Sequence, residues 1–458
     1  MAEPRVIVVG AGPAGVRAAA TLVAAGIRPL VIDEGRRDGG QIYRRQPQGF
    51  TRSYATLYGT EADRARAIHE TFDGLLAHVD YAPETLVWNV AEGHVWTHCA
   101  GEARAIPYSA LIVCSGATDR LAPIPGWDLA GCYSLGGSQV ALKSQACAIG
   151  HNVVFIGSGP LLYLVAAQYA KAGAKVAAVL DTAPFSARLR ALPKLLAQPD
   201  LLWTGARLTL ALKRAGIPVL SGVTPLEIIG TSGGGVTGIA IRTFSGARQA
   251  FACDAVAMGW HLRPETQIAD LTRCSFTFDA ATRQWLPETD ADGRATMPGI
   301  YLAGDGARIL GARCAEVTGE LAALAALTDM GHPPAAGRRR ALLAQKAGYR
   351  RFADGLAQAF PWPHELAAQV PDDAVVCRCE NVTAATLRAS VSVAGATEAN
   401  RAKAFSRVGM GRCQGRYCGA AAAEIIAATR RQAIECAGRL RGQAPVKPIA
   451  IATRKAGT

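Results

Sequence analysis

Four cysteines in the C-terminal quarter of the chain have the spacing of a metal or cluster site. One residue separates Cys377 from Cys379, four separate Cys413 from Cys418, and 33 residues lie between the two pairs. Thiolates are soft ligands, and four of them on two loops can enclose either one zinc ion or a [2Fe-2S] core. Zinc sites usually use pairs separated by two to four residues, so the uneven spacing favours the iron–sulfur cluster over a zinc knuckle.

The residues around these cysteines suit a negatively charged cluster. Arg378, Arg412 and Arg416 alternate with the ligands, although each alone is equally typical of a solvated surface charge. We expect a helix over residues 419–436, whose N-terminal dipole would favour a thiolate at Cys418. Four glycines lie near the cysteines, and because they have no side chain, their backbone N–H groups can point at sulfur. They are Gly409, Gly411, Gly415 and Gly419.

The other eight cysteines are scattered singly among apolar or turn residues. In a chain without an export signal they are not expected to form a disulfide framework. We expect them to be small buried hydrophobic residues: Cys99, Cys114, Cys132, Cys147, Cys253, Cys274, Cys314 and Cys436.

The N-terminal segment predicts a strand, a glycine-rich turn and a helix. The β-branched run at residues 5–9 leads into a Gly-x-Gly-x-x-Gly turn and an alanine-rich stretch to residue 25, and a second strand at 29–32 ends in two acids. Such a turn places a pyrophosphate at a helix N-terminus, and an acid after the second strand can accept ribose hydroxyls. The dinucleotide-binding residues predicted here are Gly10, Gly12, Pro13, Ala14, Gly15, Asp33 and Glu34.

Three further segments resemble the two-dinucleotide-fold flavoproteins, the family of thioredoxin reductase and glutathione reductase. They are the strand and turn at 110–118, the strand and Gly-Asp loop at 299–306, and the segment at 39–42. The resemblance implies that the first fold binds FAD, with contacts from Gly40, Gln41, Ala117, Thr118, Gly304 and Asp305. The sequence lacks the Cys-x-x-Cys pair of the thioredoxin reductase branch, which excludes disulfide reduction.

A second glycine-rich turn repeats the first layout about 145 residues later. The strand at 152–156 runs into Gly157 and Gly159, but Leu162 replaces the third glycine and should push the helix away from the strand. The acid, Asp181, falls one place late. Three possibilities therefore remain open for this fold: it binds NAD(H), it binds another adenine nucleotide, or it binds no ligand.

Residues 375–437 resemble the [2Fe-2S] domain of bacterioferritin-associated ferredoxin. Its fusion to a flavoprotein module resembles the α subunits of heteromeric amino-acid and opine dehydrogenases, over nearly the whole chain. The resemblance implies an α/β fold with two Rossmann-like dinucleotide-binding domains, the second inserted in the first, and a small, mainly helical C-terminal [2Fe-2S] domain. It also implies a β subunit flavoprotein that oxidises an amine or amino acid, and an acceptor protein or quinone. A small third subunit and an FMN at a subunit interface stay open.

The expected domain limits follow from these motifs. Residues 1–120 and 263–336 form the FAD-binding domain, 121–262 the inserted nucleotide-binding domain, 337–370 a linker helix, 371–440 the [2Fe-2S] domain and 441–458 a tail. The linker helix should pack an aromatic stripe into a core. The tail, with Pro445, Pro448 and Arg454-Lys455, is expected to be extended, as a docking arm or a frayed end.

The charge distribution and the hydropathy of the chain limit the kinds of partner and the cellular location that we expect. Residues 331–458 hold 20 Lys and Arg against 8 Asp and Glu, so the net charge of +13 is concentrated there. No nucleic-acid motif accompanies this surplus, which favours an acidic protein partner or the cluster itself over nucleic acid. No signal peptide or membrane span is predicted, so we expect a cytoplasmic protein, with a peripheral place on the inner face of the cytoplasmic membrane left open.

The function expected from these features is electron transfer between a partner subunit and an acceptor. Two alternatives remain open at this point. One is a free-standing NADH-dependent ferredoxin or acceptor reductase, in which the second fold feeds the flavin. The other is a redox-sensing or iron-handling docking protein.

Overall fold

The computed structural model describes residues 5–47, 49–332 and 336–449. The first dinucleotide fold is built on a sheet of seven strands, whose parallel core has the order β3-β2-β1-β6, with β19 also parallel to β6. An antiparallel extension through β5 and β4 continues the sheet. The strand bounds are β1 (Arg5–Val9), β2 (Leu30–Ile32), β3 (Asp80–Ala82), β4 (Leu86–Ala91), β5 (His94–Cys99), β6 (Glu102–Val113) and β19 (Ile300–Leu302).

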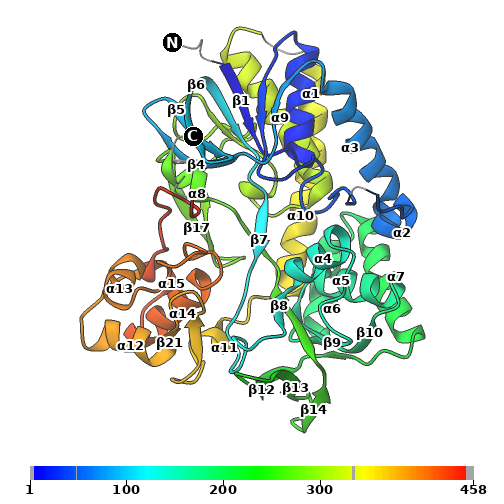
Figure 1. The fold of residues 1–458 in the computed structure, drawn as a ribbon, viewed down its shortest axis with the longest axis vertical. Helices are drawn as coiled ribbons and strands as arrows, with labels where there is room; N and C mark the ends of the chain where they lie inside the picture. The colour runs from blue at the N-terminus through cyan, green and yellow to red at the C-terminus, as the bar shows by residue number, and fades with distance from the viewer. Residues whose placement is uncertain (1–4, 48, 333–335, 450–458) are drawn as a thin grey trace, which may run out of the picture.

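The two faces of β1 pack into different cores because its side chains alternate. Val6 and Val8 join the core under helices α1 (Pro13–Ala24), α3 (Ala62–Leu75) and α9 (Ala312–Asp329). Ile7 and Val9 face residues of the β4–β6 extension and of the short helix α8 (Gln267–Leu271). Figure 1 shows this fold at the top of the molecule, with α1, α3 and α9 together on one side of the sheet.

The second dinucleotide fold has five parallel strands in the order β11-β10-β9-β15-β8. Helices α4 (Leu135–Ser144) and α5 (Pro160–Lys171) cover one face, and a three-stranded antiparallel sheet covers the other. Helices α6 (Phe185–Leu195) and α7 (Pro199–Arg214) link β10 to β11. The strands are β8 (Cys132–Ser134), β9 (Asn152–Ser158), β10 (Lys175–Asp181), β11 (Val219–Ser221), β12 (Thr224–Thr231), β13 (Gly235–Arg242), β14 (Arg248–Ala252) and β15 (Ala255–Trp260).

Two short strands connect the folds. The chain leaves the first fold through β7 (Ala117–Asp119) and returns through β16 (Leu262–Pro264), and these strands pair antiparallel, with Thr118 opposite Arg263. We call this pair the connector. The second fold is thus inserted within the first, which confirms the predicted fold class.

The C-terminal domain is small and mainly helical, as expected. It contains the hairpin β20 (Val375–Cys377) and β21 (Val382–Thr383) and helices α12 (Ala384–Ser392), α13 (Ala399–Ser406), α14 (Gly419–Arg430) and α15 (Ile434–Ala437). The single helix predicted over residues 419–436 is wrong. The helix ends at Arg430 because Arg431 adopts a left-handed conformation, with φ of 53°.

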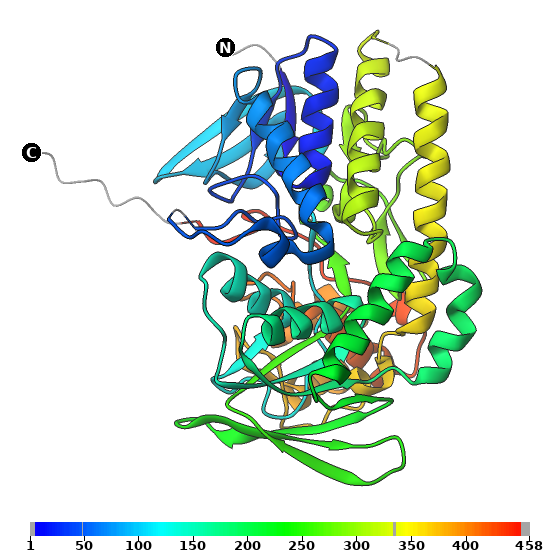
Figure 2. The same cartoon turned by 90° about the vertical axis from the view of Figure 1, so that its right-hand side faces the viewer.

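The linker helix is α10 (Ala336–Ala359), followed by the short α11 (His364–Ala368). Phe352 and Leu356 pack against Ala191 and Leu195 of α6, so the predicted packing role of the aromatic stripe is confirmed. Figure 2 shows α10 as a long rod beside α9 that reaches down to the second fold. None of the helices within the described ranges is long and apolar enough to cross a bilayer.

One expectation about the cysteines needs correction, and one of the two alternatives for the tail is ruled out over its described part. Of the eight scattered cysteines five are buried, but Cys99, Cys147 and Cys436 are exposed, because Cys99 lies at the end of β5, Cys147 in the loop after α4 and Cys436 on the short helix α15. The tail does not fray over residues 442–449, which pack against the first fold. Residues 450–458, which include Arg454-Lys455, lie outside the described residues.

Candidate functional site

The first glycine-rich turn has the close packing that a dinucleotide site requires. A Cβ added to Gly15 would lie 1.7 Å from the carbonyl oxygen of Gly10, so only glycine lets α1 start this close to β1. Gly12 is the N-cap of α1, and no side chain caps the helix. The free N–H groups of the first turn, at Ala14 and Gly15, are those that bind phosphate in such folds.

The two acids after β2 have different roles in the structure. Asp33 accepts the N–H of Ala11 at 2.5 Å and that of Gly35 at 2.6 Å, and its burial raises its pKa. Glu34 is exposed and forms an ion pair with Lys447 of the tail. Both acids line the same cavity, on the side where a ribose would follow a pyrophosphate held by α1.

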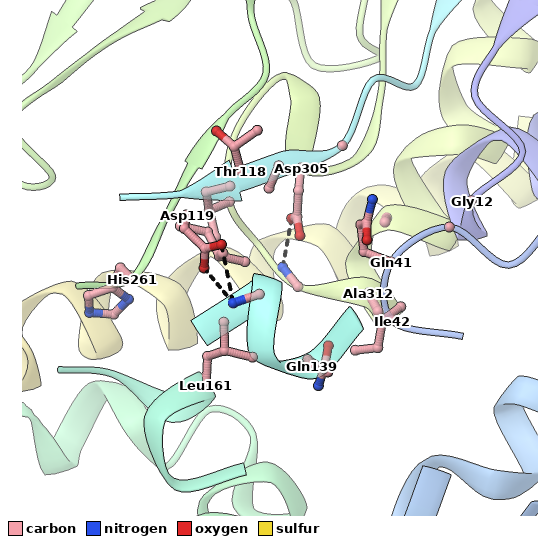
Figure 3. A pocket seen from close by; sticks show the side chains of 18 of the residues that line it. Gly12, Gln41, Ile42, Thr118, Asp119, Gln139, Leu161, His261, Asp305 and Ala312 are labelled. Carbon is pink, nitrogen blue, oxygen red and sulfur yellow. Dashed lines mark hydrogen bonds between the residues drawn. The ribbon is translucent and has the colours of Figure 1, made fainter. Parts of the chain in front are cut away.

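One large cavity of about 2120 Å³ runs through the middle of the molecule and connects the predicted flavin contacts. Figure 3 shows Gly12, Gln41, Thr118 and Asp305 around it. Asp305 accepts the N–H groups of Leu310 and Gly311 at 2.9 Å each, which fixes its carboxylate at the cavity wall. The sequence-predicted contacts that line the cavity are Gly10, Gly12, Pro13, Ala14, Asp33, Glu34, Gly40, Gln41, Ala117, Thr118, Gly304 and Asp305.

The glycines of the second glycine-rich turn do not face the central cavity as those of the first turn do. Gly157, Gly159 and Asp181 do not line the cavity. A Cβ on Gly159 would lie 3.2 Å from the His261 imidazole, which occupies the space beside the turn and bonds the carbonyl of Phe360 at 2.8 Å. Burial lowers the pKa of His261 to about 4, so the ring is neutral and has a structural role beside the turn.

Asp181 is fully buried and already has partners. One carboxylate oxygen accepts the Tyr163 hydroxyl at 2.6 Å and the Arg188 guanidinium at 2.5 Å, and the other accepts the N–H of Ala183 at 2.8 Å. A ribose hydroxyl would have to displace these donors. Leu162, in place of the third glycine, is completely buried in the core between α5 and the sheet.

The four predicted ligand cysteines converge in the C-terminal domain. The Cys418 thiol forms hydrogen bonds with the sulfurs of Cys377 and Cys413. These bonds lower the pKa of Cys377 to about 6 and also lower the pKa of Cys413. Cys413 in turn forms a hydrogen bond with Cys379. Cys377 and Cys418 are buried, whereas Cys379 and Cys413 line the central cavity. The cluster side of the domain therefore faces the predicted flavin contacts.

Backbone N–H groups support these sulfurs, as the glycines predict. Gly409 donates to Cys377, and Gly415 donates to Cys413. Gly411 is required for a different reason, because an added Cβ would lie 2.3 Å from the Cβ of Cys379. The prediction for Gly419 is wrong, because its N–H bonds the carbonyl of Gly415 and continues the helical turn.

The three arginines beside the cysteines are not equivalent. Arg416 is buried and bonds both oxygens of Glu265, at 2.6 and 3.2 Å. Arg378 lies over the Trp127 ring, 5.2 Å from its centre, and Arg412 lines the cavity. The interpretation of Arg416 as a solvated surface charge is therefore wrong, since folding brings Glu265 to it from the connector.

The donor set fits a dinuclear cluster. Four thiols meet beside cationic side chains, and backbone N–H groups support three of them, Cys377, Cys379 and Cys413. Among the described residues, no group of three or more His, Cys, Asp or Glu side chains is arranged so that it could hold a metal ion. A [2Fe-2S] core takes two thiolates on each iron, so Cys377, Cys379, Cys413 and Cys418 would hold it in two pairs.

Fold and site together define an FAD-dependent oxidoreductase with a C-terminal [2Fe-2S] domain. The chain belongs to the pyridine nucleotide-disulphide oxidoreductase family, whose model matches residues 4–327, and residues 375–428 match the BFD-like [2Fe-2S] binding domain. It is similar to the A subunit of the opine oxidase of Agrobacterium tumefaciens, with 37% identity over 97% of this chain and 90% of the relative. It is also similar to the hydrogen cyanide synthase subunit HcnB of Pseudomonas aeruginosa, with 30% identity over 97% of both chains.

A solved structure supports the same fold. The L-proline dehydrogenase of P. horikoshii matches with a TM-score of 0.69 and 17% identity, over 98% of this chain and 79% of that chain. The full-length relatives and the two matching domains together support a subunit of a heteromeric flavin and iron–sulfur dehydrogenase.

Sequence reasoning missed four residues of this site. Glu265 and Arg263 lie at the start of the predicted second part of the FAD-binding domain, but nothing in their spacing gives them a role beside the cysteines. Arg188 follows Asp181 by seven residues and meets it through the first turn of α6. Lys447 lies more than 400 residues from Glu34, so no local pattern could pair them.

Proposed function

We propose that this chain is the electron-transfer subunit of a heteromeric dehydrogenase for an amino acid, imino acid or opine. A partner β subunit oxidises the amine at its own flavin, and this chain relays the electrons to an acceptor protein or quinone. FAD exchanges electrons in pairs or singly, and a [2Fe-2S] cluster carries one at a time. Residues of this chain that would hold the two groups line one cavity.

The observation that carries the proposal is the shared cavity. Thr118 and Asp305, from the predicted flavin site, line the same space as Cys379 and Cys413. Because the ligand loop opens to the flavin contacts and not only to solvent, the geometry supports direct exchange between the two cofactors. The names of the similar chains, which are subunits of an opine oxidase and of hydrogen cyanide synthase, support the heteromeric setting.

The second fold favours the relay over a free-standing NADH-dependent reductase. Asp181 is engaged by Tyr163 and Arg188, and His261 stands against Gly159 where a nicotinamide dinucleotide would cross the turn. We therefore propose that NADH is not the electron donor. This fold is left with another adenine nucleotide or no ligand.

The test is anaerobic mixing of the purified complex with candidate donors, followed by flavin absorbance and by the electron paramagnetic resonance signal of the cluster. Octopine, nopaline, proline and hydroxyproline are suitable substrates, and NADH is tested on the isolated chain. The proposal expects that one amine substrate reduces the cluster only when the β subunit is present. Rapid bleaching of the flavin by NADH in the isolated chain would favour the reductase.

The same complex answers two remaining points. Mass analysis of the released cofactors tells whether FMN accompanies FAD, and gel electrophoresis tells whether a small third subunit is present. If the complete complex passes no electrons to any dye or acceptor, the redox-sensing or iron-handling docking protein becomes the better account.

A further inference from the structure

The chain after the last helix returns from the C-terminal domain to the first dinucleotide fold. We call residues 442–449 the strap. In Figure 1 this red segment leaves α15 and runs past α8 and β17 (Phe276–Asp279) toward β4. It is anchored at its start, because Gly442 donates its N–H to Asp270 of α8 at 2.8 Å. Arg439, just before it, forms an ion pair with the same carboxylate and lies 3.6 Å from the Phe276 ring centre.

The far end of the strap forms a wall of the cavity. Val446 is almost fully buried and donates its N–H to the Trp88 carbonyl of β4 at 3.1 Å. Val446, Lys447 and Pro448 line the cavity together with residues that follow β2 and residues that begin β4. Lys447 forms an ion pair with Glu34. The strap thus closes the end of the cavity where the adenosine half of FAD is expected.

The cluster loop holds the strap in place. Arg416, which lies between the ligands Cys413 and Cys418, donates to the Val446 carbonyl at 2.8 Å. The same side chain bonds the Cys413 carbonyl at 3.3 Å and pairs with Glu265. Any movement of the loop between these two cysteines therefore moves the main chain of the strap.

We propose that the strap is part of the FAD site, and that FAD retention and cluster occupancy are coupled through Arg416 and Val446. An ordered cluster loop keeps Arg416 on the strap, and the strap keeps the adenosine end closed. Because binding equilibria are linked reciprocally, bound FAD stabilises the cluster loop to the same extent. The inference rests on the proposed cofactors but not on the relay, the β subunit or the substrate.

The experiment measures FAD release from the full chain as recovery of flavin fluorescence, with iron content determined in parallel. One variant ends after Gln443 and lacks residues 444–458, and its matched control ends after Ile449 and keeps the strap. The shorter chain is expected to release FAD at least about tenfold faster, the usual worth of a charge-assisted hydrogen bond together with a buried side chain. The control is expected to release FAD at the wild-type rate.

A point variant keeps the test decisive if the shorter chain does not fold. Lys447→Glu places a like charge beside Glu34 and is expected to speed FAD release roughly three- to fivefold, the range of a half-exposed ion pair. The charge reversal Lys175→Glu, at an exposed site at the start of β10 that does not line the cavity, is the matched control. Equal release rates for wild type and Lys447→Glu, or for the two truncated chains, would overturn the assignment of the strap to the FAD site.

Coupling is tested by removing the cluster with a chelator under oxidising conditions. Loss of the cluster should speed FAD release from the control chain, because it frees the strap from Arg416. It should have no further effect on the chain that ends after Gln443, because that chain has already lost the part of the strap that Arg416 holds. Equal acceleration in both chains would overturn the coupling and leave the strap as a simple wall. None of these measurements depends on electron transfer, so they remain valid if the relay is disproved.

Discussion

Arg416 and Glu265 form a buried ion pair with two hydrogen bonds, of 2.6 and 3.2 Å, that joins the cluster loop to the connector. Glu265 follows β16 directly, and its N–H bonds the carbonyl of Gly116, next to the predicted flavin contacts Ala117 and Thr118. The pair therefore fixes the position of the predicted ligand cysteines relative to the predicted flavin contacts at the cavity wall.

Replacement of Glu265 by glutamine should strongly destabilise the docking of the C-terminal domain. It leaves the Arg416 guanidinium buried without a counter-charge, a change that typically costs about 3–5 kcal/mol. Denaturant unfolding of the whole chain measures the loss. Glu227→Gln is the control, because its ion pair with Arg248 is exposed and should contribute less than about 1 kcal/mol. Equal effects of the two substitutions would contradict the role given to the pair.

The same pair predicts a pH dependence. Burial opposes ionisation of Glu265, but the guanidinium groups of Arg416 and Arg263 outweigh it and lower its pKa below the ordinary value of 4.5. Its stabilising contribution is thus complete above that value and is lost as the pH falls through the lower pKa of the folded state. Thermal unfolding of wild type and Glu265→Gln should differ most near neutral pH and converge in acid. A constant difference down to strong acid would contradict the prediction.

Alanine substitutions at two glycines of the first turn should have different effects, one on stability and the other on FAD binding. In Gly15→Ala the new methyl would lie 1.7 Å from the Gly10 carbonyl, so the chain should lose about 3 kcal/mol or more of stability. In Gly12→Ala the nearest neighbour is the Gly40 Cα at 3.6 Å, an ordinary contact, so the fold should persist. The methyl would instead enter the cavity and lower FAD affinity at least about tenfold. Circular dichroism and FAD titration separate the two effects.

Loss of one ligand cysteine should remove the cluster, not the fold. Cys413→Ser is expected to bind no intact cluster, whereas Cys436→Ser, at an exposed cysteine, should keep about two irons and two sulfides for each chain. Iron, zinc and sulfide analysis of the wild-type chain provides the reference. Zinc in place of iron would disprove the [2Fe-2S] assignment.

The sequence by itself determined the fold class and the two principal cofactors, and it predicted their sites, because these signals are local. The turn from Gly10 to Gly15 and the cysteine pairs at 377–379 and 413–418 place their chemistry within a few residues, and backbone geometry then leaves little choice. The end of α14 at Arg431 escaped prediction, since an arginine rarely takes the left-handed conformation that stops a helix.

Only the tertiary structure decided which charged groups are free and which are paired. Asp181 looks like a ribose ligand in sequence, yet folding buries it under Tyr163 and Arg188. Arg416 looks like a surface charge, yet it meets Glu265 across 151 residues of chain, and Lys447 meets Glu34 across 413. The energy of a charge depends on burial and on distance to a counter-charge, and both are set by the packing of domains that no local sequence pattern records.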